Sequence, residues 1–257
     1  SGVEAMLLMA NSHIRHLPIL KNNQVVGVVT AADLLRKQSH NVVFLINEVL
    51  VSETVGELKK ISQQVPLLLQ HSFESNMDEH DITYSISSVG RSINQQLLKQ
   101  AEALLGEPPI AYAWVVAGSL ARSEQIAHTD QDNLLILSDD YDEKLHGEYF
   151  SKLSAYVSDG LDECGYVYCP GDVMATNPKW RQPVSVWRSY YNSWISSPDP
   201  KALMYASIFF DLKCIYGSPE LLDDMLSGVL NNTQKNTIFQ SHMAHNAEHY
   251  TPPLGFF

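Results

Sequence analysis

Two apolar segments joined by a turn of small residues most constrain what this chain can fold into. The first runs through Ala111–Ala117 and ends at Gly118-Ser119, and the second runs through Leu134–Leu137. Short apolar runs bounded by turn residues are typical of buried strands. The pattern therefore predicts a strand, a turn at which glycine lets the backbone approach a neighbour closely, and a second strand.

Two aspartates open the second apolar segment. Asp130 and Asp132 are one residue apart, and alternate residues of a strand project from the same side. Carboxylates on one side repel each other unless a positive charge lies between them. Mg²⁺ suits that place, because it prefers a few carboxylate oxygens with water and phosphate oxygens. Two such ions about 4 Å apart can clamp a phosphoryl transfer. The spacing therefore predicts a metal and nucleoside triphosphate site, although an isolated Asp-x-Asp is often only a solvated turn.

Gly118 and Ser119 complete this predicted site. Gly118 allows close backbone approach, and Ser119 offers a hydroxyl and an amide to phosphate oxygens.

The wider motif resembles a known family. The stretch GSLARSEQ at 118–125, followed by TDQDN at 129–133, is similar to the nucleotidyltransferases of the DUF294 family. Three later stretches share the resemblance: CPGDVMATNPKWR at 169–181, SPDPKAL at 197–203 and FFDLK at 209–213. This family belongs to the DNA polymerase β-like superfamily and is related to the uridylyltransferase and adenylyltransferase of nitrogen regulation. The resemblance implies an α+β fold, in which helical segments flank a small mixed-sheet polymerase β-like nucleotidyltransferase core.

One feature departs from the superfamily. Apolar residues usually follow each aspartate there, whereas this chain has Gln131 and Asn133. The DUF294 branch shares that difference, which leaves the substrate geometry open.

The resemblance also implies catalytic roles. Asp130 and Asp132 would bind Mg²⁺ or Mn²⁺, with a nucleoside triphosphate as the substrate. A third catalytic carboxylate usually comes from the next strand, which we expect at 165–175, and Asp172 is in that place. A turn after the preceding Pro-Gly would equally suit an aspartate, and Asp211 is the alternative.

Four charged residues extend the predicted nucleotide site. Arg122 would steady the triphosphate, and Glu124 would orient Arg122 or its loop. Lys179 and Arg181 are candidates for contacts with phosphate or base, although basic residues in a surface loop are usually solvated.

The first forty residues carry a second resemblance. Apolar stretches at 16–20 and 24–29 predict two short strands, followed by a helix at 31–37. The sequences RHLP at 15–18 and GVVTAADL at 27–34 resemble the second half of a CBS domain. This resemblance implies that Thr30 and Asp33 contact an adenosine nucleotide. The same residues also suit an ordinary helix start, and dimer formation is the alternative use of the segment.

Helical periodicity dominates the segment between these two regions. Apolar residues recur at helical spacing from 41 to 106, and Thr54 with Glu57 forms a capping-box pattern. We therefore divide the chain into a partial CBS domain (β-β-α) at 1–38, a helical segment at 39–106, a nucleotidyltransferase core at 107–181 and a helical C-terminal segment at 182–257, which we expect to be truncated.

The composition limits which classes of partner and location we expect for the chain. The 257 residues carry a formal net charge of −12 and no basic cluster, which argues against a nucleic acid substrate. No apolar stretch approaches the roughly 20 residues of a membrane span, and three cysteines are too few for a disulfide framework. We expect a cytoplasmic homodimer.

The sequence thus favours a Mg²⁺-dependent nucleotidyltransferase in signal transduction that modifies a protein or small-molecule acceptor. Its rivals are a catalytically inactive module that senses nucleotide and a purely structural dimerisation protein.

Overall fold

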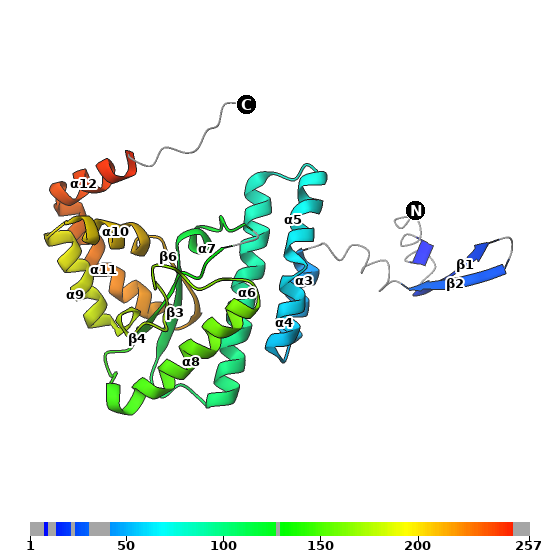
Figure 1. Cartoon of the computed structure of the whole chain (residues 1–257), viewed down its shortest axis with the longest axis horizontal. Helices are drawn as coiled ribbons and strands as arrows, with labels where there is room; N and C mark the ends of the chain where they lie inside the picture. The colour runs from blue at the N-terminus through cyan, green and yellow to red at the C-terminus, as the bar shows by residue number, and fades with distance from the viewer. Residues whose placement is uncertain (1–7, 10–13, 22–23, 31–41, 127–128, 249–257) are drawn as a thin grey trace.

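The computed structural model describes residues 8–9, 14–21, 24–30, 42–126 and 129–248 (Figure 1). Its elements in chain order are β1 (His16–Lys21), β2 (Gln24–Thr30), α3 (Val42–Val51), α4 (Val55–Ser62), α5 (Val65–Glu74), α6 (Glu79–Leu105), β3 (Tyr112–Ala117), α7 (Gly118–Arg122), β4 (Asn133–Leu137), α8 (Glu143–Glu163), the 3₁₀ helix η1 (Pro178–Trp180), β5 (Arg181–Pro183), α9 (Val184–Ser196), α10 (Pro200–Phe209), β6 (Leu212–Gly217), α11 (Pro219–Lys235) and α12 (Thr237–Glu248). These elements confirm the α+β class.

A four-stranded mixed sheet forms the centre of the fold. Its strand order is β5-β4-β3-β6. Strand β3 pairs antiparallel with both β4 and β6, whereas β4 and β5 are parallel. The expected small mixed sheet is therefore confirmed. Its edge strand β6 comes from the segment at 182–257, which we expected to be helical, so the sheet is not complete within 107–181.

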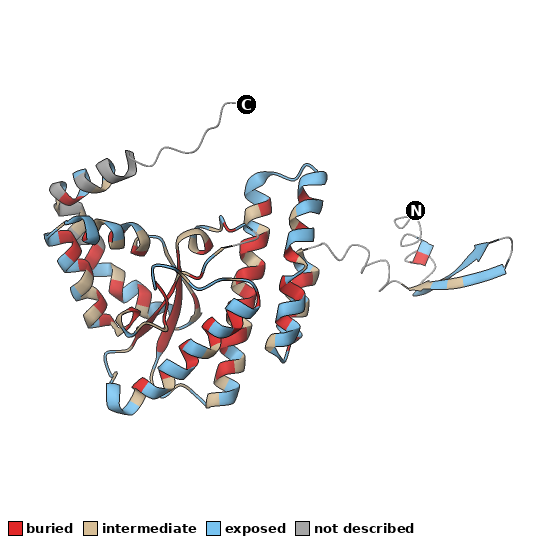
Figure 2. Ribbon diagram, in the orientation of Figure 1, coloured by how far each residue is buried: buried red, intermediate tan, exposed pale blue. Residues whose placement is uncertain are grey.

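Both faces of the two central strands are buried, because β3 and β4 alternate between two hydrophobic cores. Trp114 and Val116 of β3 face a core that includes α6 and α8, whereas Ala113 and Val115 face a core that includes α9, α10 and α11. The helices lie on the two sides of the sheet in Figure 1, and Figure 2 shows its central strands β3 and β4 as buried. This double burial explains the uninterrupted apolar runs in the sequence.

The helices before the sheet follow the predicted pattern. Thr54 caps α4, and the reciprocal contact of Glu57 completes the capping box. The next break lies at Asp78, which caps the long helix α6 by accepting a hydrogen bond from the backbone of His80. Helix α6 then packs against α3 and α5 on one side and α8 on the other.

An aromatic core fixes the other face of the sheet. Its largest buried members are Trp180, Trp187, Tyr191, Trp194 and Phe209. Trp187 has no exposed surface, and its indole N–H donates to the carbonyl of Leu135 at 3.1 Å, which anchors α9 to β4.

The N-terminal strands form a hairpin. Strands β1 and β2 pair antiparallel, with His16 opposite Thr30. Thr30 is thus the last residue of β2 and is half-buried. Asp33 and the helix expected at 31–37 lie outside the described residues.

The strand expected at 165–175 does not form. Only Val167 makes a strand-like bridge, to Asp130. A turn follows, in which the amide of Asp172 donates to the carbonyl of Cys169 at 2.9 Å and Asp172 has φ of +54°. The Pro-Gly pair before it favours a turn over a strand.

No helix in the described part of the chain is long and apolar enough to cross a membrane.

A pair of glycines tests how tightly the β3–β6 edge is packed. Gly217 has φ of +84°, and a Cβ there would lie 2.2 Å from the carbonyl oxygen of Tyr112. Gly106 has a similar φ of +89°, but nothing lies within 4 Å of its Cβ position. We expect Gly106→Ala to cost about 1–3 kcal/mol of unfolding free energy, because φ of 89° with ψ of 178° is a backbone conformation that only glycine adopts readily.

Gly217→Ala should cost about 1–3 kcal/mol more than that, because the backbone clash adds to the strain. Urea denaturation of both variants measures the difference. Equal losses of unfolding free energy in the two variants would show that the backbone at the β3–β6 edge can shift to accept a Cβ without a free-energy penalty.

Candidate functional site

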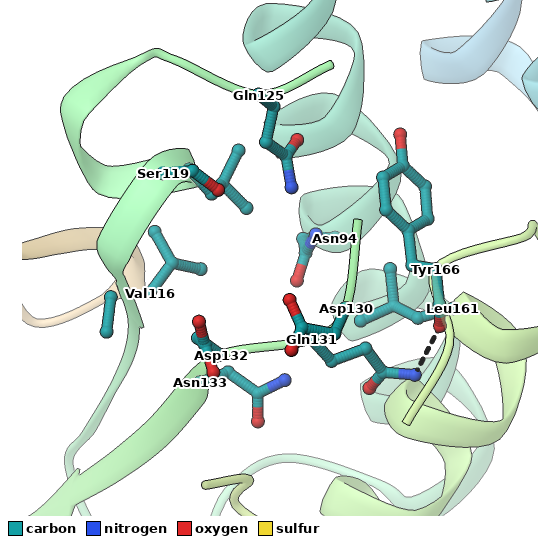
Figure 3. Close-up of a pocket in the computed structure, with 12 residues that line it drawn as sticks. Asn94, Val116, Ser119, Gln125, Asp130, Gln131, Asp132, Asn133, Leu161 and Tyr166 are labelled. Atoms are coloured by element: carbon teal, nitrogen blue, oxygen red, sulfur yellow. Dashed lines mark hydrogen bonds between the residues drawn. The ribbon is translucent and has the colours of Figure 1, made fainter. Parts of the chain in front are cut away.

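The candidate site lies where β3 ends and β4 begins. Helix α7 starts at Gly118 directly after β3, and Asp132 precedes the first residue of β4. The amide of Ala117 donates to the carbonyl of Asp132 at 3.0 Å, so the turn and the acidic segment are held side by side. In Figure 3, Ser119 and Gln125 lie across a small cavity from Asp130 and Asp132.

Three potential metal ligands meet at this place. One carboxylate oxygen each from Asp130 and Asp132 and the sulfur of Cys169 lie within 4.8 Å of one another. The expected convergence of the two aspartates is therefore present. In the part of the chain that the structure describes, no other group of three or more acidic, histidine or cysteine side chains is arranged in this way.

The two carboxylates are electrostatically strained. Burial raises the pKa of Asp132, and the neighbouring charge of Asp130 raises it further. A hydrogen bond with Cys169 and the charge of Arg122 act in the opposite direction. A cation between the carboxylates would relieve this repulsion, so the donor set fits a divalent metal ion.

Gly118 is required by its position. Its φ is +58°, and a Cβ there would lie 3.3 Å from Oδ2 of Asp132. Glycine thus permits both the turn and the close approach of the carboxylate.

Arg122 is held beside the turn by two carboxylates. Its Nε lies 2.7 Å from Oε2 of Glu124, and its Nη1 lies 2.7 Å from Oδ2 of Asp211. These hydrogen bonds raise the pKa of Arg122. The carbonyl of Asp211 also accepts from the amide of Gly118 at 3.2 Å. Asp211 therefore serves Arg122 and the turn.

Asp172 does not join the acidic pair in the structure. Its carboxylate accepts a hydrogen bond from the side-chain amide of Asn177 at 2.8 Å, and its carbonyl accepts from the indole of Trp180. Its catalytic role stays a prediction, while the third place beside Asp130 and Asp132 is taken by Cys169.

Lys179 and Arg181 contact other groups. The ammonium of Lys179 lies 4.4 Å from the ring centre of Trp180 and 4.1 Å from that of Tyr205. Arg181 is buried and donates to the carbonyls of Ala175 and Thr176. These contacts hold the loop and the aromatic core, and neither residue lines the cavity at the aspartates.

The polar residues after each aspartate bind the loop at 165–175. Gln131 is buried and donates to the carbonyls of Ser158 and Tyr166 at 2.9 and 2.8 Å. Asn133 is also buried, and its side-chain oxygen accepts from the amide of Ala175 at 2.8 Å. The departure from the apolar superfamily pattern therefore has a structural reason: these two side chains fix the loop that carries Cys169.

A small polar cavity lies behind the acidic pair. Its volume of about 10 Å³ corresponds to about one water molecule. Gln125 and Gln131 line it, and the Oε1 atom of each is buried without a hydrogen-bond partner among the described residues. In sequence, Gln131 stands out only as a departure from the superfamily and Gln125 has no signal of its own, since only the fold shows that both line this cavity.

The comparisons with known proteins agree with this architecture. A search of curated proteins finds no match to the chain. The model of the CBS domain matches residues 3–40, which include the hairpin β1–β2. The model of the family described as "Putative nucleotidyltransferase DUF294" matches residues 63–201. That match spans more than half of the chain and contains the turn, both aspartates and the loop with Cys169. The chain therefore belongs to the DUF294 nucleotidyltransferase family.

Proposed function

We propose that this protein is a metal-dependent nucleotidyltransferase that moves a nucleoside monophosphate from a nucleoside triphosphate to a protein or small-molecule acceptor. Family membership supports nucleotidyltransferase activity in general. The observation that carries the finer proposal is the convergence of Asp130 and Asp132 beside the Gly118-Ser119 turn.

Asp130 and Asp132 would hold the metal, Mg²⁺ or Mn²⁺. A bound divalent ion supplies charge neutralisation for the phosphates and for the transition state. Asp132 is half-buried and Asp130 is exposed, so one carboxylate is partly enclosed by the fold while the other is open to solvent and to a substrate. The backbone contact between Ala117 and Asp132 keeps this arrangement in register with the turn.

The turn and Arg122 would bind the triphosphate. Gly118 allows phosphate oxygens to approach the backbone, and Ser119 contributes a hydroxyl at the edge of the cavity. Arg122 is preorganised, because Glu124 and Asp211 hold its planar guanidinium on two sides. A preorganised arginine loses little conformational entropy when it binds phosphate.

The reaction itself would be an in-line displacement. A hydroxyl oxygen of the acceptor forms a bond to the α-phosphorus, the bond from that phosphorus to the pyrophosphate oxygen breaks, and the hydroxyl proton passes to a carboxylate of the pair or to water. Positioning and charge neutralisation would provide most of the rate enhancement. The net charge of −12 favours an acceptor other than nucleic acid.

The N-terminal segment would give the enzyme a regulatory input. We propose that the CBS-type segment, with Thr30 and Asp33, takes part in signal transduction by sensing an adenosine nucleotide or by joining two chains in a homodimer. The match at 3–40 supports a CBS unit but not either role by itself.

The first prediction from the proposed function concerns the acidic pair. Asp130→Asn/Asp132→Asn should abolish metal-dependent binding of nucleoside triphosphate, because the amides carry no charge to hold the ion. Isothermal titration with ATP, UTP, GTP and CTP in the presence of Mg²⁺ or Mn²⁺ measures this. Asp139→Asn/Asp140→Asn, an exposed pair just beyond the other end of β4, removes the same charge and should leave binding unchanged. Metal-dependent binding that survives in the first variant would contradict the proposal.

The second prediction concerns Arg122. Arg122→Ala should weaken ATP binding about ten- to a hundredfold, the range expected for a lost hydrogen bond to a charged group. Binding of AMP, which lacks the outer phosphates, should change much less. Arg188→Ala is the matched control, because Arg188 is similarly exposed and also pairs with a carboxylate, that of Asp224 at 2.6 Å. An equal loss for ATP and AMP would place Arg122 away from the triphosphate.

One observation favours the nucleotide-sensing alternative. The carboxylate of Asp172, the expected third catalytic carboxylate, pairs with Asn177 and not with the acidic pair. Pyrophosphate release separates the two functions. The enzyme should release pyrophosphate with a suitable acceptor and lose this activity in Asp132→Asn, whereas a sensing module would bind nucleotide without ever releasing pyrophosphate.

A further inference from the structure

The third donor at the acidic pair is a thiol. Cys169 is half-buried, and its sulfur lies within 4.8 Å of a carboxylate oxygen of each aspartate. Two carboxylates and one sulfur at this spacing form a mixed ligand set, which differs in kind from three carboxylates.

The position of Cys169 is set by the acidic segment itself. The amide of Gln131 donates to the carbonyl of Val167 at 2.9 Å, two residues before the cysteine. On the other side, the amide of Ala175 donates to Asn133. The residues between and beyond the two aspartates therefore fix both ends of the loop, so the thiol is held in place and does not approach the carboxylates only by chance.

A second observation points to a bound group at this place. Gln131 is 3% exposed and lines the cavity shared by Asp130 and Asp132, yet its Oε1 has no hydrogen-bond partner in the described part of the chain. A buried amide oxygen without a partner costs free energy. A bound water in the cavity, which Asp130 and Asp132 also line, would satisfy it, since the space corresponds to about one water molecule.

We propose that Cys169 is the third protein ligand of the metal site, and that its sulfur adds affinity for borderline ions such as Co²⁺ and Zn²⁺ beyond what the two carboxylates give for Mg²⁺ or Mn²⁺. This inference rests on the proposed function, because it completes the same metal site. On binding, the S–H bond breaks, the sulfur coordinates the ion as a thiolate, and the proton leaves to solvent. Soft sulfur donors select such ions, whereas carboxylate and water ligands suit Mg²⁺ and Mn²⁺.

Titration with Co²⁺ tests the proposal without any enzymatic readout. The full chain should develop a thiolate-to-cobalt charge-transfer absorption at one equivalent, and Cys169→Ser should lose it. The same substitution should weaken Co²⁺ binding by more than about a hundredfold, beyond the roughly ten- to hundredfold loss typical of an outer-shell contact, and weaken Mn²⁺ binding much less. Cys214→Ser is the matched control, because Cys214 is also half-buried but lies in β6, where its thiol donates to the carbonyl of Tyr216.

A second variant guards against a folding defect. Cys169→Asp supplies a carboxylate at the same place, so it should bind Mn²⁺ more tightly than Cys169→Ser does and show no charge-transfer band. Persistence of the band in Cys169→Ser overturns the role of Cys169 alone, provided that Asp130→Asn/Asp132→Asn abolishes Co²⁺ binding. Absence of any Co²⁺ or Mn²⁺ binding to the unsubstituted chain overturns the proposed function together with this inference.

Discussion

The repulsion between Asp130 and Asp132 is the constraint on which the candidate site depends. Burial and like charge both oppose ionisation of Asp132, so the unliganded arrangement is costly. The backbone leaves the two side chains little room to separate. One side of their segment is bonded to the end of β3 and the other to the loop at Val167. The fold thus holds a charge pattern that a cation stabilises. Two buried polar side chains, Gln131 and Asn133, hold the loop at 165–175 against this segment.

Arg122 extends the same electrostatic arrangement to the turn. Its two ion pairs join the loop after α7 to the residue that precedes β6, and Asp211 adds a backbone contact with Gly118. Positive and negative charges therefore alternate across the end of the sheet. A triphosphate and its metal ion would fit into this alternation with small rearrangement, which is the property expected of a site organised for phosphoryl transfer.

Local patterns in the sequence were sufficient for much of this fold. The buried strands, the capping box at Thr54 and the convergence of the two aspartates all follow from residues close together in the chain, where periodicity and spacing decide the geometry. The α+β class followed from the family resemblance. The strand expected at 165–175 was wrong, because contacts with Gln131 and Asn133 stabilise a loop that no local pattern reveals.

The remaining site residues depend on contacts between distant segments. Cys169 reaches the aspartates only because its loop docks on the acidic segment. Lys179 looks like a phosphate ligand in sequence, but its ammonium lies against the rings of Trp180 and Tyr205, and Tyr205 is contributed by a later helix. A basic residue near a motif therefore does not by itself predict that its side chain lies at the phosphate site, since aromatic rings compete for the same cation.

Strand β6 has a consequence for how the chain is made. It borders β3, the strand that leads into the candidate site, and Gln95 of α6 donates to the carbonyl of Ile215, 120 positions along the chain. As the chain leaves the ribosome, one edge of β3 stays unpaired until residue 217 has emerged. An unpaired apolar edge is prone to pair with other chains. An expression fragment cut at residue 201, where the family match ends, would keep that edge permanently and would tend to aggregate.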